Sequence, residues 1–322
     1  MSAVNRALLG AVAWIVFVIA RGSDLRSDAW SHAWLLFAAL VLVPLALDLL
    51  ADADEAEQPA RWFRWIQRVQ LPAALALTVA CWLPPGAFAA LAALPWVGVT
   101  GLLATIGFAR LRQGGWRRDF DGICRDAALM YAAIGGVWTL VDRTGYQPLG
   151  FAPAIVTLTA VHFHYAGLML PLFAGLVQRE VFFWRLASRA GVGVLLGVPA
   201  VALGITFTQL GWGRSLEAAA GCGLALAGMA VAILQVRLGL DVKRPLATRL
   251  LLGISGASLF FAMVLVVLYA LRTSAAGGVW LTLPQMRLVH GAINALGFAL
   301  CGVLAWRRMN NAPLPTRWTS GG

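Results

Sequence analysis

The sequence predicts an all-α, polytopic transmembrane helical bundle of about ten spans with both termini in the cytoplasm. Of its 322 residues, 60% are hydrophobic and only 12% are charged, and the mean hydropathy is +0.78. A soluble globular domain is far less apolar. Because a helix needs roughly 20 apolar residues to cross the hydrocarbon core, each long apolar stretch predicts one span.

Polar or proline-containing segments separate the predicted spans. Leu83-Pro84-Pro85-Gly86 favours a tight turn between two antiparallel helices, since proline does not continue a helix. No soluble domain fits in what remains, so we expect one transmembrane domain over 1–310 and a disordered tail over 311–322. The ten predicted spans lie at about residues 7–20, 30–50, 69–82, 86–108, 124–141, 151–177, 190–210, 216–236, 250–271 and 285–306.

The first span also resembles a signal peptide, because Arg6 precedes a short apolar core. Cleavage near Ala20 would leave nine spans in the same orientation. These two interpretations of the first span stay open.

Basic residues are distributed unequally between the two sides of the predicted bundle, although a net charge of +11 is also typical of nucleic-acid-binding proteins. With the N-terminus inside, most of the 25 Lys and Arg residues fall on the cytoplasmic side. This asymmetry follows the positive-inside rule and favours membrane lipids over nucleic acid as the partner of the basic surface. The outer side receives Arg21, Arg26, Arg143, Arg214, Arg272 and Arg287.

Two histidines and a tyrosine lie together in the apolar run from Phe151 to Val177. Ionisable side chains at this depth are costly and usually functional. Helical spacing places His162 and Tyr165 on one face, whereas His164 is rotated by about 200° from His162 at 100° per residue. Pro171 is expected to bend the helix by displacing the carbonyl of Gly167.

Further polar residues cluster toward the outer face of the predicted bundle. In the last span, Arg287, His290 and Asn294 share one stripe at helical spacing. Because each of these groups needs a partner in a dry environment, we expect many of them to share one pocket. The predicted catalytic residues are His162, His290, Asp142 and Glu217, and the predicted substrate-binding residues are Tyr165, Asn294, Trp138, Gln209, Arg287 and His164.

Structural roles are the alternatives for several of these residues. His164 is also typical of an interhelical hydrogen-bonding histidine. Asp142 with Arg143, and Arg214 with Glu217, also suit interfacial ion pairs. His32, near Asp28, is expected at the membrane interface. The four cysteines have no paired spacing and suit packing positions better than disulfides or a metal cluster.

Two segments resemble the bacterial YndJ-like membrane proteins. They are Thr157-Leu-Thr-Ala-Val-His-Phe-His-Tyr-Ala-Gly167, followed by Pro171, and His290-Gly-Ala-Ile-Asn-Ala-Leu-Gly-Phe298. The resemblance implies a multi-span bundle and a polar site, but little chemistry. The residues that the resemblance implies for this polar site are His162, His164, Tyr165, His290 and Asn294.

The tetrapeptide His-Phe-His-Tyr alone is similar to the haem-ligating helix of haem-copper oxidase subunit I. There, two histidines on opposite helix faces serve different haems. This chain departs from that pattern, because it has about ten spans and lacks an additional paired-histidine copper motif. Only His32 and His290 remain as further axial ligands.

The leading functional hypothesis is a membrane enzyme that acts on a lipophilic small molecule in a pocket in the outer half of the membrane. The expected reaction is an isomerisation, an epoxide opening or a cyclisation. His162 or His290 would act as acid or base, with Asp142 or Glu217 as the charge partner. No metal or cofactor is expected for this reaction. The alternatives are a proton-coupled transporter and a haem- or metal-binding redox protein. We expect the protein in the bacterial cytoplasmic membrane, and the sequence leaves its oligomeric state open.

Overall fold

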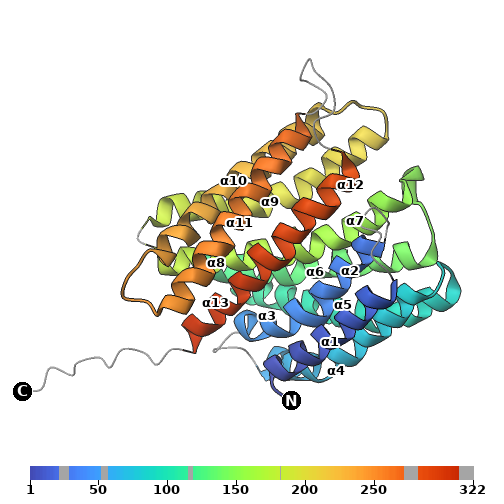
Figure 1. Cartoon of the computed structure of the whole chain (residues 1–322), viewed down its shortest axis with the longest axis horizontal. Helices are drawn as coiled ribbons and strands as arrows, with labels where there is room; N and C mark the ends of the chain where they lie inside the picture. Colours follow the sequence, from blue (N-terminus) through green and yellow to red (C-terminus); the bar gives the residue numbers. More distant parts are fainter. Residues whose placement is uncertain (22–28, 52–56, 115–118, 182, 272–281, 312–322) are drawn as a thin grey trace, which may run out of the picture.

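The computed structural model describes residues 1–21, 29–51, 57–114, 119–181, 183–271 and 282–311. Within these ranges it contains ten continuous helices and no strand, which confirms the all-α bundle (Figure 1). Of the predicted tail over 311–322, all but Asn311 lies outside the described residues, and the last helix ends at Asn310.

Seven of the ten helices are α-helical throughout, and the other three contain a widened, π-helical segment. The uniform helices are α1 (Ala3–Arg21), α4 (Glu57–Trp82), α5 (Ala87–Gly114), α6 (Phe120–Thr144), α9 (Trp184–Gln209), α10 (Ser215–Gly239) and α11 (Leu246–Ala270). The first interrupted helix consists of α2 (Ala29–Phe37), η1 (Ala38–Leu42) and α3 (Val43–Leu50). The second consists of α7 (Pro153–His164), η4 (Tyr165–Met169) and α8 (Leu170–Glu180). The third consists of α12 (Leu283–Gln285), η5 (Met286–His290), η6 (Ile293–Leu300) and α13 (Cys301–Asn310).

Eight of the described helices are long and apolar enough to cross a membrane by themselves. The other two, α4 and α6, correspond to the predicted third and fifth spans. The first half of α4 is polar and carries Arg61, Arg64 and Arg68, and α6 has acidic and basic residues near both ends. Both pack against α5, so the protein itself covers part of their surface.

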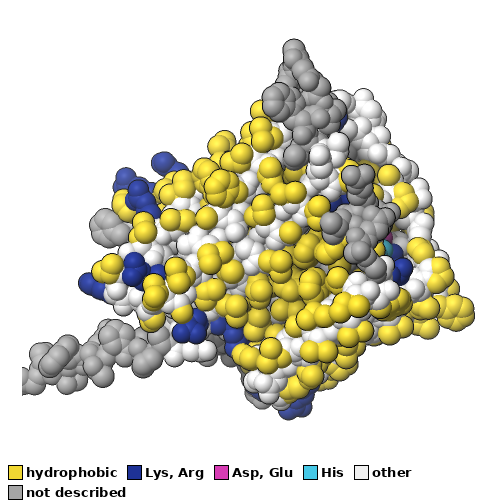
Figure 2. Space-filling view, in the orientation of Figure 1, with side chains coloured by type: hydrophobic (Ala, Val, Ile, Leu, Met, Phe, Trp, Pro, Cys, Tyr) yellow, Lys and Arg dark blue, Asp and Glu magenta, His cyan; other side chains and the backbone are white. Residues whose placement is uncertain are grey.

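The start of α1 and the end of α13 lie at the same end of the bundle (Figure 1). Arg307 near the end of α13 donates to the carbonyl oxygen of Leu45 at 2.9 Å and to the carboxylate of Asp48 at 2.5 Å. Figure 2 shows Lys and Arg side chains gathered at this end, with hydrophobic side chains covering the surface beyond it. The arrangement agrees with an arginine-rich side that holds both termini.

Three interrupted helices meet in the interior of the bundle. The segment η6 contacts both η1 and η4. Pro171 follows η4 by two residues, at the place where the sequence predicted a distorted helix. A proline ring clashes with the carbonyl of the residue four positions earlier, and the wider π-helical turn accommodates that clash. Such segments occur frequently at functional sites.

The turn predicted at Leu83-Pro84-Pro85-Gly86 is present, because α4 ends at Trp82 and α5 begins at Ala87. The backbone N–H of Gly86 donates to the carbonyl oxygen of Arg143 at 2.8 Å. This contact ties the turn to the outer end of α6.

Candidate functional site

A cavity of about 110 Å³ lies where the interrupted helices meet α9, α10 and α11. Its wall is mainly aliphatic, with glycine and Phe298, and its polar side chains come from three helices. The polar or partly polar residues of the wall are Trp34, His162, Tyr165, His290 and Asn294. All of these except Trp34 were expected from the sequence to share one pocket.

The imidazoles of His162 and His290 lie close together, nearly parallel, in the wall of this cavity. Their ring centroids are 6.4 Å apart and their planes differ by 19°. The Nδ1 atom of His162 lies 3.3 Å from the carbonyl oxygen of Leu158, and Nδ1 of His290 lies 3.2 Å from that of Ala262. A carbonyl only accepts, so these contacts assign the proton of each neutral ring to Nδ1. Each Nε2 therefore carries a lone pair and can act as a base.

Tyr165 and Asn294 donate hydrogen bonds to backbone carbonyls beside the two imidazoles. The hydroxyl of Tyr165 donates to the backbone carbonyl of Trp34 at 2.9 Å, which joins η4 to α2. The amide Nδ2 of Asn294 donates to the carbonyl oxygen of His290 at 2.8 Å. Both residues border the cavity, but these donor groups already serve to position the backbone.

His164 is not part of the cavity wall and is completely buried. Its Nε2 accepts from the indole N–H of Trp96 at 3.0 Å, and its Nδ1 lies 2.8 Å from the carbonyl oxygen of Ala160. The absence of a side chain at Gly135 admits the ring, since a methyl there would lie 2.8 Å from Nδ1. Both ring nitrogens are occupied, which agrees with the structural alternative for His164 rather than with substrate binding. A haem on this face would have to displace Trp96.

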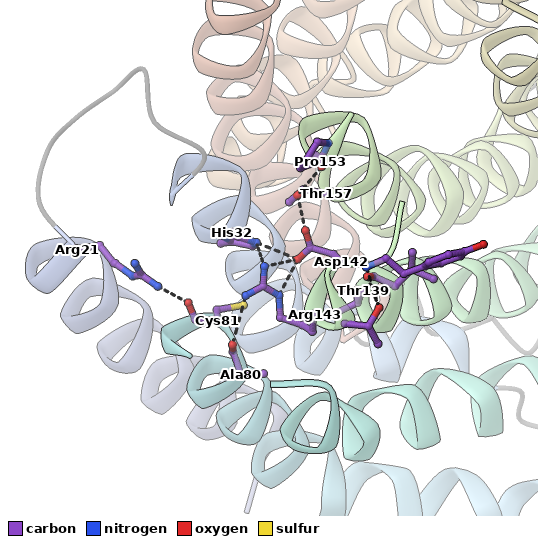
Figure 3. Close-up of polar contacts among 12 residues, drawn as sticks. Arg21, His32, Ala80, Cys81, Thr139, Asp142, Arg143, Pro153 and Thr157 are labelled. Carbon is purple, nitrogen blue, oxygen red and sulfur yellow. Dashed lines mark hydrogen bonds and ion pairs between the residues drawn. The ribbon is translucent and has the colours of Figure 1, made fainter. Parts of the chain in front are cut away.

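Asp142 belongs to a second, separate cluster near the outer end of α6 (Figure 3). One carboxylate oxygen lies 2.7 Å from Nε of Arg143 and 3.0 Å from Nε2 of His32. The other oxygen accepts from the hydroxyl of Thr157 at 2.5 Å. Arg143 also donates to the carbonyl oxygen of Ala80 at 3.4 Å. The side chains of Asp142 and Arg143 are only 6% and 4% exposed, so this ion pair is buried rather than interfacial.

His32 Nε2 lies between a donor and an acceptor within this cluster. It is 2.8 Å from Nη2 of Arg143, which only donates, and 3.0 Å from the carboxylate of Asp142, which accepts when ionised. Neutral His32 can accept from Arg143, whereas protonated His32 can donate to Asp142. The contact to each neighbour therefore depends on where the proton of His32 resides.

The remaining predicted residues lie away from the cavity wall. Glu217 pairs with Arg214 at 3.7 Å on a partly exposed surface, and Gln209 donates to the carbonyl oxygen of Leu149 at 3.1 Å. Trp138 packs edge-on against Phe151. Arg287 is half-buried in η5. The structure thus separates Asp142 and Glu217 from the imidazoles for which they were expected to be charge partners.

The sequence did not indicate Trp34 as a cavity residue, and it suggested an interfacial position for His32. Both lie in the second span, where the only signal was a histidine among tryptophans near the outer end. The pairing of His32 with Asp142 joins residues 110 positions apart, so helical spacing within one span does not reveal it.

The fold and these two sites define a multi-pass α-helical membrane protein with a cavity and a buried charge cluster inside the bundle. The chain belongs to the YndJ-like family, because the family profile described as YndJ-like protein matches residues 33–298. It is 30% identical over 180 residues to the Uncharacterized membrane protein YndJ of Bacillus subtilis (strain 168). That match covers 56% of this chain but 31% of the relative, so the chain spans less than a third of that protein's length. No solved structure matches the chain.

Proposed function

We propose that the protein is an integral membrane enzyme that performs acid/base chemistry on a lipophilic small molecule. Isomerisation, epoxide opening and cyclisation are the reaction classes that such chemistry serves. The observation that carries the proposal is the pair His162 and His290, whose Nδ1 atoms both lie near backbone carbonyls beside one apolar cavity. This leaves two basic Nε2 atoms beside a site suited to a lipophilic molecule.

The depth of the two histidines and the exposure of His162 support entry from the bilayer. His162 follows the first residue of α7 by nine positions, or about 14 Å along a helix. His290 follows the start of α12 by seven positions. The side chain of His162 is exposed on the bundle, although it also lines the cavity. At that depth an exposed side chain contacts hydrocarbon, so a lipophilic molecule can reach the imidazoles without crossing water.

Chemistry at this site needs one proton transfer in each direction. One imidazole Nε2 takes a proton from the substrate and becomes an imidazolium. That proton exchanges with solvent and passes to Nε2 of the other imidazole, which donates it to another atom of the substrate. The contact of Nδ1 with the carbonyl oxygen of Ala262 orients the imidazole of His290. The buried carboxylate of Asp142 is committed to His32, Arg143 and Thr157, so we assign no step of the reaction to it.

Solvent deuterium tests this function and does not require the substrate to be identified. Membranes that contain the wild-type protein are incubated in D₂O, and the extracted lipophilic molecules are analysed by mass spectrometry. We expect a product that carries solvent deuterium with the wild type but not with His162→Gln or His290→Gln. Glu217→Gln, which changes an ion pair outside the cavity, serves as the matched control and should keep the product. Equal labelling with all variants and with empty membranes would contradict the proposal.

Proton-coupled transport of a small molecule is the second candidate, and the position of His32 favours it. A nitrogen held between Arg143 and Asp142 can change partner as it gains or loses a proton. Transport would give substrate-dependent proton uptake into vesicles that is lost in His32→Gln, with no deuterium in the carried molecule. An absorption spectrum of the same preparation tests the haem alternative. We propose the bacterial cytoplasmic membrane as the location, with the arginine-rich end in the cytoplasm.

A further inference from the structure

Trp34 presents a buried hydrogen-bond donor without a partner at the wall of the cavity. Only 5% of the residue is exposed, and no acceptor among the described residues lies within hydrogen-bonding distance of its Nε1. Its backbone carbonyl accepts from Tyr165, which fixes the residue at this place. A buried donor without an acceptor is unfavourable and therefore rare in folded proteins.

Other tryptophans show that the fold can satisfy this group where no cavity is present. The indole N–H of Trp14 donates to the carbonyl oxygen of Ala33 at 2.7 Å, and that of Trp96 donates to His164. Trp306 also lacks a partner among the described residues, but it does not line the cavity. Trp34 therefore combines two properties: an N–H without a partner among the described residues, and a place in the wall of the cavity.

Gly291 packs closely against this N–H because it has no side chain. A methyl group at Gly291 would lie 2.8 Å from Nε1 and 3.0 Å from Cδ1 of Trp34. Gly291 directly follows His290, and all three residues border the cavity. The indole donor and one of the imidazole bases are thus at neighbouring positions of the same wall.

We propose that the indole N–H of Trp34 binds the carbonyl oxygen of the substrate, so that the substrate class is a lipophilic, enolisable carbonyl compound. This inference rests on the proposed acid/base function. An imidazole Nε2 removes a proton from the carbon next to the carbonyl, and the electrons of that C–H bond form a carbon–carbon double bond. The carbonyl electron pair moves to oxygen, where the N–H of Trp34 stabilises the negative charge. In a β,γ-unsaturated ketone the proton is then delivered to the γ-carbon, the carbonyl re-forms, and the carbon–carbon double bond moves next to it without an oxidant or a cofactor; in a saturated ketone the proton returns to the same carbon.

A carbonyl probe tests the contact directly. The full-length protein in lipid nanodiscs is mixed with 2-octanone labelled with ¹³C at the carbonyl, and the carbonyl stretch is recorded by isotope-edited infrared spectroscopy. We expect a saturable band at lower frequency than that of the ketone in lipid alone. Trp34→Phe should weaken the binding reported by this band by about two- to tenfold, which corresponds to one neutral hydrogen bond. Trp306→Phe, which removes another buried indole N–H without a partner among the described residues but lies outside the cavity wall, is the matched control and should keep the band.

A second variant protects the test from misfolding of Trp34→Phe. Gly291→Ala keeps the indole but places a methyl against Nε1, so it should also weaken the shifted band. A band that is unchanged in both folded variants would overturn the inference, as would a wild-type protein without a shifted band.

Deuterium exchange next to the carbonyl of the same ketone in D₂O separates this inference from the proposed function. If the carbonyl contact and the acid/base function are both correct, the wild-type protein accelerates deuterium exchange. His162→Gln then loses this acceleration but keeps the shifted infrared band. A band that depends on Trp34 without protein-catalysed exchange would support the carbonyl contact and contradict the acid/base function. Catalysed exchange with a band independent of Trp34 would support the function and overturn the contact.

Discussion

Replacement of Asp142 by asparagine should cause a large loss of stability, because it leaves the guanidinium of Arg143 buried without its carboxylate. The two charges are 2.7 Å apart, and both side chains are less than one-tenth exposed. At an effective dielectric constant of about 20, Coulomb's law gives a gross attraction of about 6 kcal/mol at this distance. The asparagine oxygen retains part of that interaction. We therefore expect a decrease in the free energy of unfolding of about 3–5 kcal/mol, as found when one partner of a buried pair is removed.

The free energy of unfolding can be measured by titration with SDS in mixed micelles, followed by tryptophan fluorescence. The double variant Asp142→Leu with Arg143→Met removes both charges, so it should recover most of the lost stability and fall within about 2 kcal/mol of the wild type. The partly exposed pair Arg214 and Glu217, 3.7 Å apart, is the control. Glu217→Gln should change the free energy of unfolding by less than about 1 kcal/mol.

Two results would rule out an uncompensated buried charge as the cause of the loss. A decrease below about 1 kcal/mol in Asp142→Asn would mean that water reaches the cluster and screens the pair. A double variant at least as unstable as the single variant would mean that the loss arises from packing or from the contacts of Thr157 and His32.

Three further outcomes follow from individual contacts. Gly107→Ala should reduce stability by about 1–3 kcal/mol, because its methyl would lie 2.5 Å from the carbonyl oxygen of Asp126. Gly101→Ala, on the same helix, meets nothing within 4 Å and should be neutral or stabilising. SDS titration of the two variants measures this difference in stability. His164→Leu should lose about 1–3 kcal/mol of stability but keep solvent-deuterium incorporation, and a folded His164→Leu protein without incorporation would contradict a purely structural role. Tyr165→Phe should cost about 1 kcal/mol by the same titration, since it removes the hydroxyl that donates to α2, and an unchanged stability would mean that this contact contributes nothing.

Features set within one helix could be predicted from the sequence. The runs of apolar residues indicated the spans, and the 100° rotation per residue separated His162 from His164. The clash expected at Pro171 indicated a distortion, which the structure contains as η4. These properties depend on neighbours a few positions away, so the chain itself specifies them.

Contacts between helices could not be predicted in the same way. The sequence placed Asp142 near the outer face, but its partner there is His32 on another helix. The rotation of each helix in the bundle decides such pairings, and π-helical turns change that rotation along the last helix. Trp34 was missed for the same reason, because its N–H is notable only after the surrounding helices are in place.

The proposed function requires His162 and His290 to act together on one lipophilic molecule. This requirement can be measured as the rate of solvent-deuterium incorporation for His162→Gln, His290→Gln and the double variant at equal levels of folded protein. Because residues that act as a unit give strongly non-additive losses, we predict that the double variant loses little more than the more severely affected single variant. Independent, multiplicative losses, or full activity in either single variant, would show that the two imidazoles do not work as a pair.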